Sequence, residues 1–419
     1  MSHKVHVSSE IGHLRRVIVH RPDEGIARVT PKMATELLFD DIVHLPHMQE
    51  EHDIFTDVLR AFLGKENVLE TQTLLAEALE ADDEGRQWII DNIVNFEELP
   101  SRYRTMLAQM PNDKLADVII TGYMPDEDLF LFRPIPNFIF TRDIAVTIND
   151  HVIITKAAKE ARYRENFITR LIFWVHPIFK GMKKKGKLIN LNHVEEFPPS
   201  RRGEAISIEG GDVMVIDRDY LLIGCSERTT AHAIHSLREV LFKKGVVKNV
   251  VQINIPFERS YMHIDTIFTQ INTNHIVAYK PIVIEGLSSH VEVHRSNGVS
   301  IYYDSIYDFF KNEINPNMRF ILSGNGESPY QEREQWTDGC NLVTIKPGVA
   351  ITYDRNPKTE EAFRDFGYAI LHATEFLERV NAGTLDPGTL KNTIITIPSD
   401  ELSRARGGTH CMTCPIERD

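Results

Sequence analysis

The chain has 419 residues, 42% of them hydrophobic and 26% charged, which is typical of a globular protein and not of a disordered one. Its formal net charge of −13 argues against a nucleic-acid partner, because such partners require a cationic surface. The first residues lack the apolar core of a secretory signal, no apolar run is long enough to span a membrane, and only four cysteines occur. We therefore expect a cytoplasmic protein without membrane association.

The N-terminal part of the chain predicts one strand followed by helices. Leu14–Val19 has the apolar pattern of a buried strand, and the spacing of apolar residues predicts a helix over Met48–Phe62. From about residue 70 apolar residues recur only at helical intervals. We therefore predict a helical insertion over 70–123, within a larger α/β domain formed by 1–69 and 124–419.

Four later stretches share one form, in which a polar residue precedes an apolar strand, a polar turn and a second apolar strand. Helical patterns separate them, so each unit is predicted to be a hairpin plus a helix. The leading residues are Asp143, Asp212, Asp265 and Asn341, and the helical patterns are Ala157–Val175, Thr229–Phe242 and Thr359–Leu371.

Repeated units of this size favour a closed ring whose last unit is completed by both ends of the chain. Equivalent positions in such a ring face one axis and would line one central pocket. The residues gathered there would be Asp143, Glu209, Asp212, His263, Asp265 and the segment around Cys411. The alternative is an open mixed α/β sheet, in which these acids only cap strands or turns.

The C-terminal segment places a thiol directly after a glycine pair, Gly407-Gly408, in the run that leads to Cys411. Glycines let the backbone approach a ligand closely, and a thiolate is a strong nucleophile. Cys411 and Cys414 also form a Cys-x-x-Cys pair, which elsewhere indicates a redox couple or half of a zinc site. Pro415 leaves no room for the helix of a redox motif, and zinc requires four ligands.

Several carboxylates around one pocket would repel one another unless a cation occupied it. A hard metal such as magnesium would accept them, but it leaves the thiol and the histidine without a task. A planar guanidinium uses all three groups, because carboxylates pair with its N–H groups, a thiolate can attack its central carbon, and histidine can transfer protons. We therefore predict a site for a guanidinium-bearing substrate that requires neither a metal nor an organic cofactor.

At these motifs the sequence resembles the arginine deiminases of the guanidino-group modifying superfamily. The matching stretches are Ser9–Gly12 through His20–Pro22, Leu38–Ile42, Pro136–Asp143, Ile208–Asp212, Met262–Phe268, Asp338–Pro347 and Arg406–Pro415. The resemblance implies a five-bladed α/β propeller, the pentein fold, with an inserted helical domain. It also implies hydrolysis of L-arginine to L-citrulline and ammonia through a covalent thiouronium intermediate, and a homo-oligomer, either a dimer or a tetramer.

The resemblance implies a role for each matching residue. The catalytic set would be Cys411 as nucleophile, His263 as general acid and base, Glu209 as the acid that hydrogen-bonds the guanidinium and assists His263, and Asp143 and Asp265 as the pair that holds the guanidinium. The substrate-binding set would be Asn137, Arg162 and Arg228 at the α-carboxylate, Phe140 along the side-chain channel, and Arg406 as a mobile arginine near the nucleophile. Without the resemblance, Arg162 reads as an exposed helix residue and Arg228 as a loop charge.

Other interpretations stay open at this point. Related chemistry includes an agmatine or methylarginine hydrolase and an amidinotransferase, in which an amine replaces water. Outside that chemistry are a non-catalytic arginine-binding protein and a metal or redox protein built on the Cys-x-x-Cys pair. The stretches 183–202 and 324–336 depart from the family pattern, and loops near a pocket mouth can change the substrate.

Overall fold

The computed structural model describes residues 4–39 and 41–419. Residues 1–3 and Asp40 of the Leu38–Ile42 motif lie outside the described residues. Within those ranges, no helix combines the length and the apolar character that crossing a membrane requires. The fold is α/β, with helices and short sheets alternating along the chain.

Four three-stranded groups follow one pattern, in which an antiparallel hairpin is joined by a third strand parallel to its second strand. A helical segment precedes each third strand, as a parallel crossover requires. The groups are β5 (Ala145–Ile148), β6 (His151–Ile154) and β7 (Leu188–Asn190); β8 (Val213–Val215), β9 (Tyr220–Cys225) and β10 (Asn249–Asn254); β11 (Phe268–Asn272), β12 (His275–Ala278) and β15 (Arg319–Leu322); and β16 (Val343–Lys346), β17 (Val349–Tyr353) and β19 (Thr393–Ile397).

A fifth group with the same pattern joins the two ends of the chain. β20 (Cys414–Arg418) pairs antiparallel with β1 (Leu14–Val19), and β1 pairs parallel with β2 (Val68–Glu70). The strand predicted over Leu14–Val19 and the four predicted hairpins are thus confirmed. The closed five-bladed ring stays a prediction, because the described strands pair within separate sheets.

Among the described residues, four further strand pairings extend or accompany these groups. β13 (His290–Arg295) and β14 (Ser300–Tyr303) add to the edge at β10, and β18 (Ala369–His372) adds to β19. β3 (Tyr123–Met124) and β4 (Leu129–Phe130) form a short ribbon of their own. The predicted helix over Thr359–Leu371 is wrong in its second half, since Gly367 at φ +84° ends the helical stretch and β18 follows.

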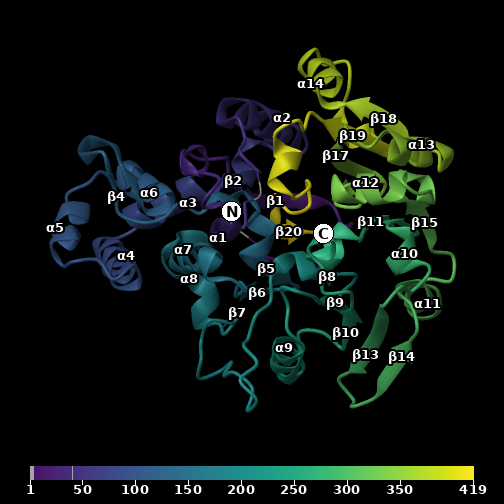
Figure 1. The fold of residues 1–419 in the computed structure, drawn as a ribbon, viewed down its shortest axis with the longest axis horizontal. Coiled ribbons are helices and arrows are strands. Elements are labelled where there is room, and N and C mark those ends of the chain that lie inside the picture. The colour runs from purple at the N-terminus through teal and green to yellow at the C-terminus, as the bar shows by residue number, and fades with distance from the viewer. Residues whose placement is uncertain (1–3, 40) are drawn as a thin grey trace.

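Four helices that follow β2 project from the sheets, at the left of Figure 1. Their apolar faces share a buried core with α7, which includes Leu75, Ile90, Ile119 and Ile168. They are α3 (Thr71–Glu80), α4 (Asp83–Phe96), α5 (Arg102–Ala108) and α6 (Asn112–Thr121). The assignment of 70–123 as a separate domain stays a prediction.

The remaining helices cover the sheets. α2 (Leu45–Leu63) contains the predicted helix Met48–Phe62, and it packs on α14 (Ala373–Asn381) through the stacked rings of Phe62 and Phe376. The others are α1 (Ala34–Leu37), α7 (Tyr163–Val175), α8 (Pro177–Lys184), α9 (Ala231–Lys244), α10 (Lys280–Val283), α11 (Ile306–Phe309), α12 (Tyr330–Trp336) and α13 (Pro357–Asp365).

Candidate active site

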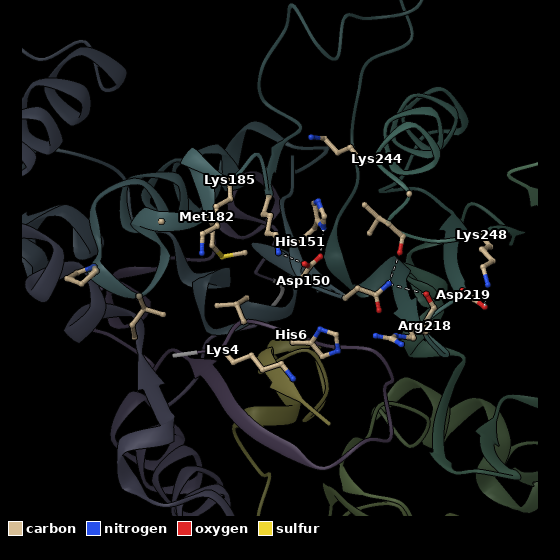
Figure 2. Close-up of a pocket in the computed structure, with 18 residues that line it drawn as sticks. Lys4, His6, Asp150, His151, Met182, Lys185, Arg218, Asp219, Lys244 and Lys248 are labelled. Carbon is tan, nitrogen blue, oxygen red and sulfur yellow. Dashed lines mark hydrogen bonds and ion pairs between the residues drawn. The ribbon is translucent and has the colours of Figure 1, made fainter. Parts of the chain in front are cut away.

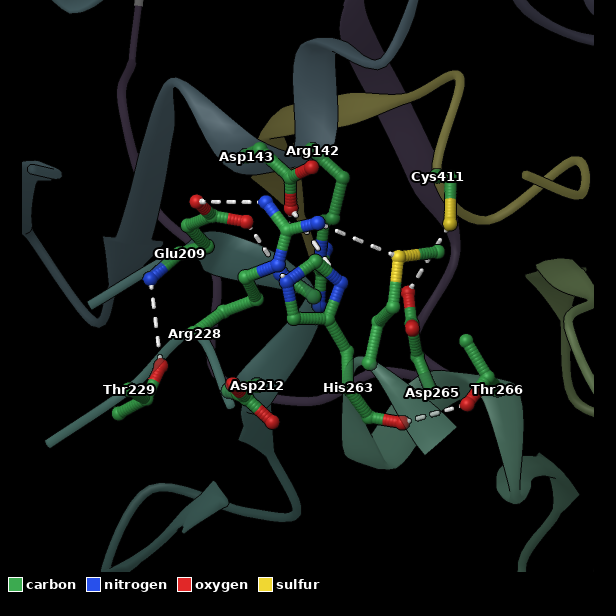
Figure 3. Close-up of polar contacts among 12 residues, drawn as sticks. Arg142, Asp143, Glu209, Asp212, Arg228, Thr229, His263, Asp265, Thr266 and Cys411 are labelled. Carbon is green, nitrogen blue, oxygen red and sulfur yellow. Dashed lines mark hydrogen bonds and ion pairs between the residues drawn. The ribbon is translucent and has the colours of Figure 1, made fainter. Parts of the chain in front are cut away.

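The predicted acids lie in tight turns that lead into the hairpins. Single turns of 3-10 helix cover Thr141–Asp143, Gly210–Asp212 and Ile264–Thr266, immediately before or one residue short of β5, β8 and β11. Such turns aim side chains away from the sheet that follows. Figure 3 shows Asp143, Glu209, His263 and Asp265 converging from these separate segments, with Cys411 facing them from the chain that leads into β20.

Gly211 and Gly407 permit this convergence, because their lack of a side chain leaves room for the rings of His263 and Phe140. A Cβ atom on Gly211 would lie 2.5 Å from Nδ1 of His263, and one on Gly407 would lie 2.3 Å from the Phe140 ring. Contacts this short do not occur between real atoms, so any larger residue would displace the histidine or the phenylalanine. The glycines of the Gly210-Gly211 and Gly407-Gly408 pairs thus set the distance between the site's segments.

His263 and Glu209 form a buried pair. Nε2 of His263 lies 2.9 Å from Oε2 of Glu209, and the two residues expose 4% and 0% of their surfaces. Burial lowers the pKa of His263, but Asp143 and Glu209 outweigh it and raise that pKa to about 10. The imidazole is therefore protonated at neutral pH and can donate a proton inside the site.

Cys411 is held by an amide and a carboxylate. Nδ2 of Asn341 lies 3.2 Å from Sγ, the thiol lies 3.4 Å from Oδ2 of Asp265, and the Cys411 N–H donates to Oδ1 of Asn341 at 3.1 Å. Burial, followed by the charges of Asp265 and Asp143, raises the pKa of the thiol well above its usual value. In this arrangement Cys411 is a neutral thiol that requires a nearby cation to ionise at neutral pH.

Asp265 has one engaged oxygen and one without a hydrogen-bond partner. Oδ2 lies 2.8 Å from Nδ1 of His410, whereas Oδ1 is buried and accepts no hydrogen bond from the described residues. Nε2 of His410 lies 3.3 Å from Glu10, which in turn pairs with Arg142 at 2.6 Å. A buried carboxylate oxygen without a donor is costly, and a cationic ligand with N–H groups would satisfy it.

Sequence reasoning missed four residues that hold this network: Glu10, Arg142, Asn341 and His410. Each lies inside a stretch that the family resemblance covers, and His410 directly precedes the nucleophile candidate. Spacing gives no signal for the contact between Glu10 and His410, because the two residues are 400 positions apart. Only a complete fold brings them together.

Asp212 lies outside the pocket, unlike the sequence-based expectation. Its Oδ2 accepts from Oγ of Ser226 at 2.6 Å, and its Oδ1 accepts from the N–H of Ile264 at 3.0 Å. Burial raises the pKa of this carboxyl to about 7. Asp212 therefore fixes the turn between His263 and Asp265 and does not face the other acids.

Arg162 lies among the acids, and its reading as an exposed helix residue is wrong. Nη1 donates to Oδ2 of Asp143 at 2.6 Å and lies 3.4 Å from Oε2 of Glu209. Nε and Nη2 both donate to Oε2 of Glu165, at 3.0 and 2.8 Å. The residue is only 5% exposed. A guanidinium thus already occupies two of the carboxylates expected to receive one.

The other predicted substrate-binding residues surround the same space. Nδ2 of Asn137 donates to the Leu37 carbonyl at 2.6 Å, and Phe140 packs against Gly407. Arg228 is buried with few close partners, since its Nη1 lies 3.8 Å from Glu209 and its Nη2 lies 3.7 Å from the Met262 sulfur. Arg406 has a left-handed backbone, and its guanidinium covers the Trp336 ring at 3.1 Å from the centroid.

A cavity of about 30 Å³ lies between these side chains. Of the ten predicted site residues, all except Asp265 line it. Its volume suits a water molecule and is far below the roughly 300 Å³ at which small-molecule pockets begin. A substrate of the size of an amino acid must therefore displace side chains, and Arg162 and Arg406 are two of the four arginines on the wall.

Among residues 4–39 and 41–419, two groups of side chains could in principle hold a metal. Ligand atoms of Asp143, Glu209 and His263 lie within 4.8 Å of one another, and so do those of His47, Glu51 and Asp400. In the first group a metal would compete with the hydrogen bonds of Arg162 and with the protonated imidazole of His263. Cys414 does not join either group.

The Cys-x-x-Cys pair does not act as a unit in this structure. The Cys414 thiol donates to the carbonyl of Ala145 at 3.2 Å, and both Cys411 and Cys414 are free. Burial raises the pKa of Cys414 to about 12. A thiol this basic does not act as the reactive member of a redox couple near neutral pH.

Comparison with known proteins gives a family and a fold. The model of the family described as arginine deiminase matches residues 35–129 and 113–418. Among solved structures, the amidinotransferase SxtG from Microseira wollei has a TM-score of 0.54 at 14% identity, covering 99% of this chain and 97% of that one. The N-terminal domain of ArgZ, a cyanobacterial arginine dihydrolase, has a TM-score of 0.51 at 13% identity, with 96% and 97% covered. DDAH from Pseudomonas aeruginosa, complexed with citrulline, has 0.50 at 14%, with 96% and 99% covered.

Proposed function

Because the chain belongs to the arginine deiminase family, we propose that it hydrolyses free L-arginine to L-citrulline and ammonia. The proposal rests on the family match and on the chemistry of the pocket. The five three-stranded groups of one pairing pattern support a five-bladed ring as the scaffold, and we expect the enzyme to assemble as a homo-oligomer.

The observation that supports this proposal most directly is the position of Arg162. Its guanidinium lies on Asp143 and Glu209, so these carboxylates suit the group that the substrate would bring. Oδ2 of Asp265 lies 3.4 Å from Sγ of Cys411, and the other oxygen of that carboxylate, Oδ1, is a further acceptor that no described residue uses. A substrate guanidinium bound between Asp143 and Asp265 would have its central carbon next to Sγ.

In the first half-reaction, the bound cation lowers the pKa of the Cys411 thiol, whose proton leaves to solvent. The thiolate attacks the guanidinium carbon, and a C–S bond forms. Protonated His263 donates its proton to one terminal nitrogen, which departs as ammonia when the C–N bond breaks. His263 is then neutral, and Cys411 carries a thiouronium.

In the second half-reaction, neutral His263 removes a proton from water and the resulting hydroxide attacks the thiouronium carbon. Collapse of the tetrahedral intermediate breaks the C–S bond, the proton of its hydroxyl group leaves to solvent, citrulline is released and Cys411 returns as a thiolate. His263 ends protonated, as its pKa of about 10 requires at neutral pH. Glu209 holds the imidazole in place at both stages.

Substrate entry requires Arg162 to leave Asp143, because one carboxylate cannot pair fully with two guanidinium groups. Nε and Nη2 of Arg162 hold Glu165 whereas Nη1 contacts Asp143, so Arg162 can keep its pair with Glu165 while Nη1 turns away from Asp143. Arg228, whose ion pairs with Glu209 and Glu227 are long at 3.8 and 3.9 Å, is the cation best placed to receive the α-carboxylate of arginine.

The test is to mix the purified protein separately with arginine, agmatine and dimethylarginine, without added metal. Products are measured colorimetrically, and the intact protein is followed by mass spectrometry. We expect citrulline from arginine, with a transient adduct that maps to Cys411. Product from agmatine alone, or from dimethylarginine alone, would show that this compound and not arginine is the substrate. Transfer of the amidino group to an added amine would indicate an amidinotransferase. Absence of every product would refute the enzymatic proposal.

A further inference from the structure

The molecule also contains a large basic cavity that the proposed reaction does not use. It has a volume of about 1370 Å³ and lies where five segments meet (Figure 2). These segments are residues 4–6 before β1, the β5–β6 turn at 149–151, the end of α8 with the residues that follow, the β8–β9 turn at 218–219, and residues 244–248 after α9. None of its lining residues lines the active-site cavity.

The lining carries an excess of positive charge. Six lysine or arginine residues and two histidines face two aspartates, in a chain whose overall charge is −13. The cations are Lys4, Lys185, Lys187, Arg218, Lys244 and Lys248, and the others are His6, His151, Asp150 and Asp219. Clustered charge of one sign in a concave surface focuses the electrostatic field and attracts counter-ions.

Half of these cations are already engaged. Lys187 pairs with Asp150, Lys248 with Asp219 at 2.9 Å, and Nζ of Lys244 donates to the carbonyl of Gly186 at 3.0 Å. Both aspartates are therefore used.

The other three, Lys4, Lys185 and Arg218, make no side-chain hydrogen bond or ion pair with the described part of the chain. Figure 2 shows Lys4 on one side of the hollow, Lys185 on the opposite side and Arg218 beside His6. Three positive charges without a paired acid among the described residues thus surround the basic cavity.

The histidines report the same positive potential. Burial lowers the pKa of His6, and Lys4 and Arg218 lower it further. Burial also lowers the pKa of His151, to which Lys244 and Lys187 add, although Asp150 opposes them. An anion placed among these groups would relieve the repulsion and favour the protonated histidines.

We propose that this basic cavity binds a small molecule that carries several linked phosphate groups. One phosphate cannot contact cations on opposite sides of the hollow, whereas a chain of phosphates can. Lysine is a compact point charge suited to phosphate, and arginine can bind it with two parallel hydrogen bonds. The volume exceeds the usual range for small ligands, so a polyphosphate with an attached organic group also fits.

The test is calorimetric titration of the full chain at low salt with inorganic tripolyphosphate, ATP, orthophosphate and citrate. We expect tripolyphosphate to bind at least about tenfold more tightly than orthophosphate or citrate, since it alone can reach several cations. Binding of ATP as well would indicate a nucleotide, and tripolyphosphate without ATP would indicate a phosphate chain. Equal affinity for citrate, or no binding, would overturn the proposal.

A matched pair of variants locates the site. Lys184 and Lys185 are adjacent at the end of α8, but only Lys185 lines the cavity. Lys185→Gln should weaken tripolyphosphate binding about tenfold, equivalent to one charge-assisted contact, and Lys184→Gln should weaken it less than about twofold. Arg218→Gln should match Lys185→Gln. Equal losses at Lys184 and Lys185 would place the anion elsewhere.

Two further readouts separate this proposal from its competitors. The pKa of His6, followed by NMR, should rise when tripolyphosphate binds, and in Arg218→Gln the same rise should require about tenfold more ligand. A duplex oligonucleotide that binds more tightly than ATP would overturn the small-molecule assignment. Arginine hydrolysis by Lys185→Gln should equal that of the unaltered protein, so loss of the proposed activity and loss of anion binding are distinguishable.

Discussion

The two cavities of this protein place charge in opposite ways. In the active-site cavity the charged groups are buried, short hydrogen bonds fix most of them, and about 30 Å³ of space remains. In the basic cavity the space is about 1370 Å³, and Lys4, Lys185 and Arg218 have no hydrogen-bonded partner among the described residues. Two acids and four arginines line the first cavity, whereas six lysine or arginine residues and two aspartates line the second.

This difference separates groups arranged for chemistry from groups arranged for reversible binding. A reaction requires atoms held at set distances in a site without bulk water, where electrostatic interactions are strong. Binding of a polyanion requires only a high local potential, which mobile side chains supply. The active-site cavity should therefore depend on single atoms, and the basic cavity on summed charge.

The largest effect should come from the nucleophile. Cys411→Ala removes the only atom that can form the covalent intermediate, and we expect kcat to fall by about 10⁵-fold or more. The control is Cys414→Ser, which lies in the same segment and should keep most of the activity, because its thiol donates to the Ala145 carbonyl and does not line the active-site cavity. Steady-state citrulline formation measures both. Comparable losses in the two variants would contradict the proposed nucleophile.

The second largest effect should come from Asp265, a carboxylate with one oxygen that accepts no hydrogen bond from the described residues. Asp265→Asn keeps the size of the side chain but removes the charge that would face the guanidinium, and we expect kcat/KM to fall by about 10³-fold. The measurement is kcat/KM together with the melting temperature. A large fall in melting temperature with little change in kcat/KM would assign Asp265 to the fold alone.

The pH dependence of thiol reactivity tests the burial of Cys411. Because its folded pKa lies well above the usual value, the thiolate fraction should rise about tenfold per pH unit between pH 7 and 9, and so should the rate of alkylation by iodoacetamide. Peptide mapping identifies the labelled cysteine and distinguishes it from Cys414. A rate that levels off below pH 8 would show an ionised thiol and contradict the neutral one.

The carboxylate-binding cation is expected to act on affinity more than on turnover. Arg228→Gln should raise the KM for arginine by about 10- to 30-fold, which corresponds to one charge-assisted contact. The KM for agmatine, which lacks the carboxylate, should change less than about threefold. Steady-state kinetics with both substrates compare the two, and equal changes would remove the clamp from the proposal.

The smallest effect should come from salt, which tests whether ligand binding in the two cavities differs in its dependence on ionic strength. Raising NaCl from 50 to 500 mM should weaken tripolyphosphate binding about tenfold, because exposed charges are screened at this ionic strength. The KM for arginine should change less than about twofold, since buried ion pairs are screened little. Parallel titrations and kinetics in the same buffers provide the measurement. Equal salt dependence would place both ligands in comparably exposed sites.

Much of this fold could be predicted from local pattern. The hairpins that follow Asp143, Asp212 and Asp265 have polar turns between apolar strands, and the four helices in 71–121 follow a clear helical spacing. These features depend on residues close in sequence. Helix ends were less accurate, as at Gly367, where one residue with a positive φ ended a periodic stretch.

The site was predictable in part. Asp143, Glu209, His263 and Asp265 stand at equivalent turns, which the repeat made visible. The position of Arg162 was not predictable, because an arginine three residues before Glu165 looks like an exposed pair on a helix. The basic cavity was hidden for a related reason, since its six cations come from four separate segments and only the lysine-rich run at 183–187 stands out in the sequence.

The pairing of β1 with β20 has a consequence for how the enzyme becomes active. Thr141 donates to the carbonyls of Ile18 and Met412, and His410 contacts Glu10 across 400 positions, so the nucleophile is positioned only after the most distant contacts form. Closing so long a loop is slow relative to forming local hairpins and helices. During refolding, helical signal should therefore return first and citrulline formation last, and a chain still emerging from the ribosome should have no activity.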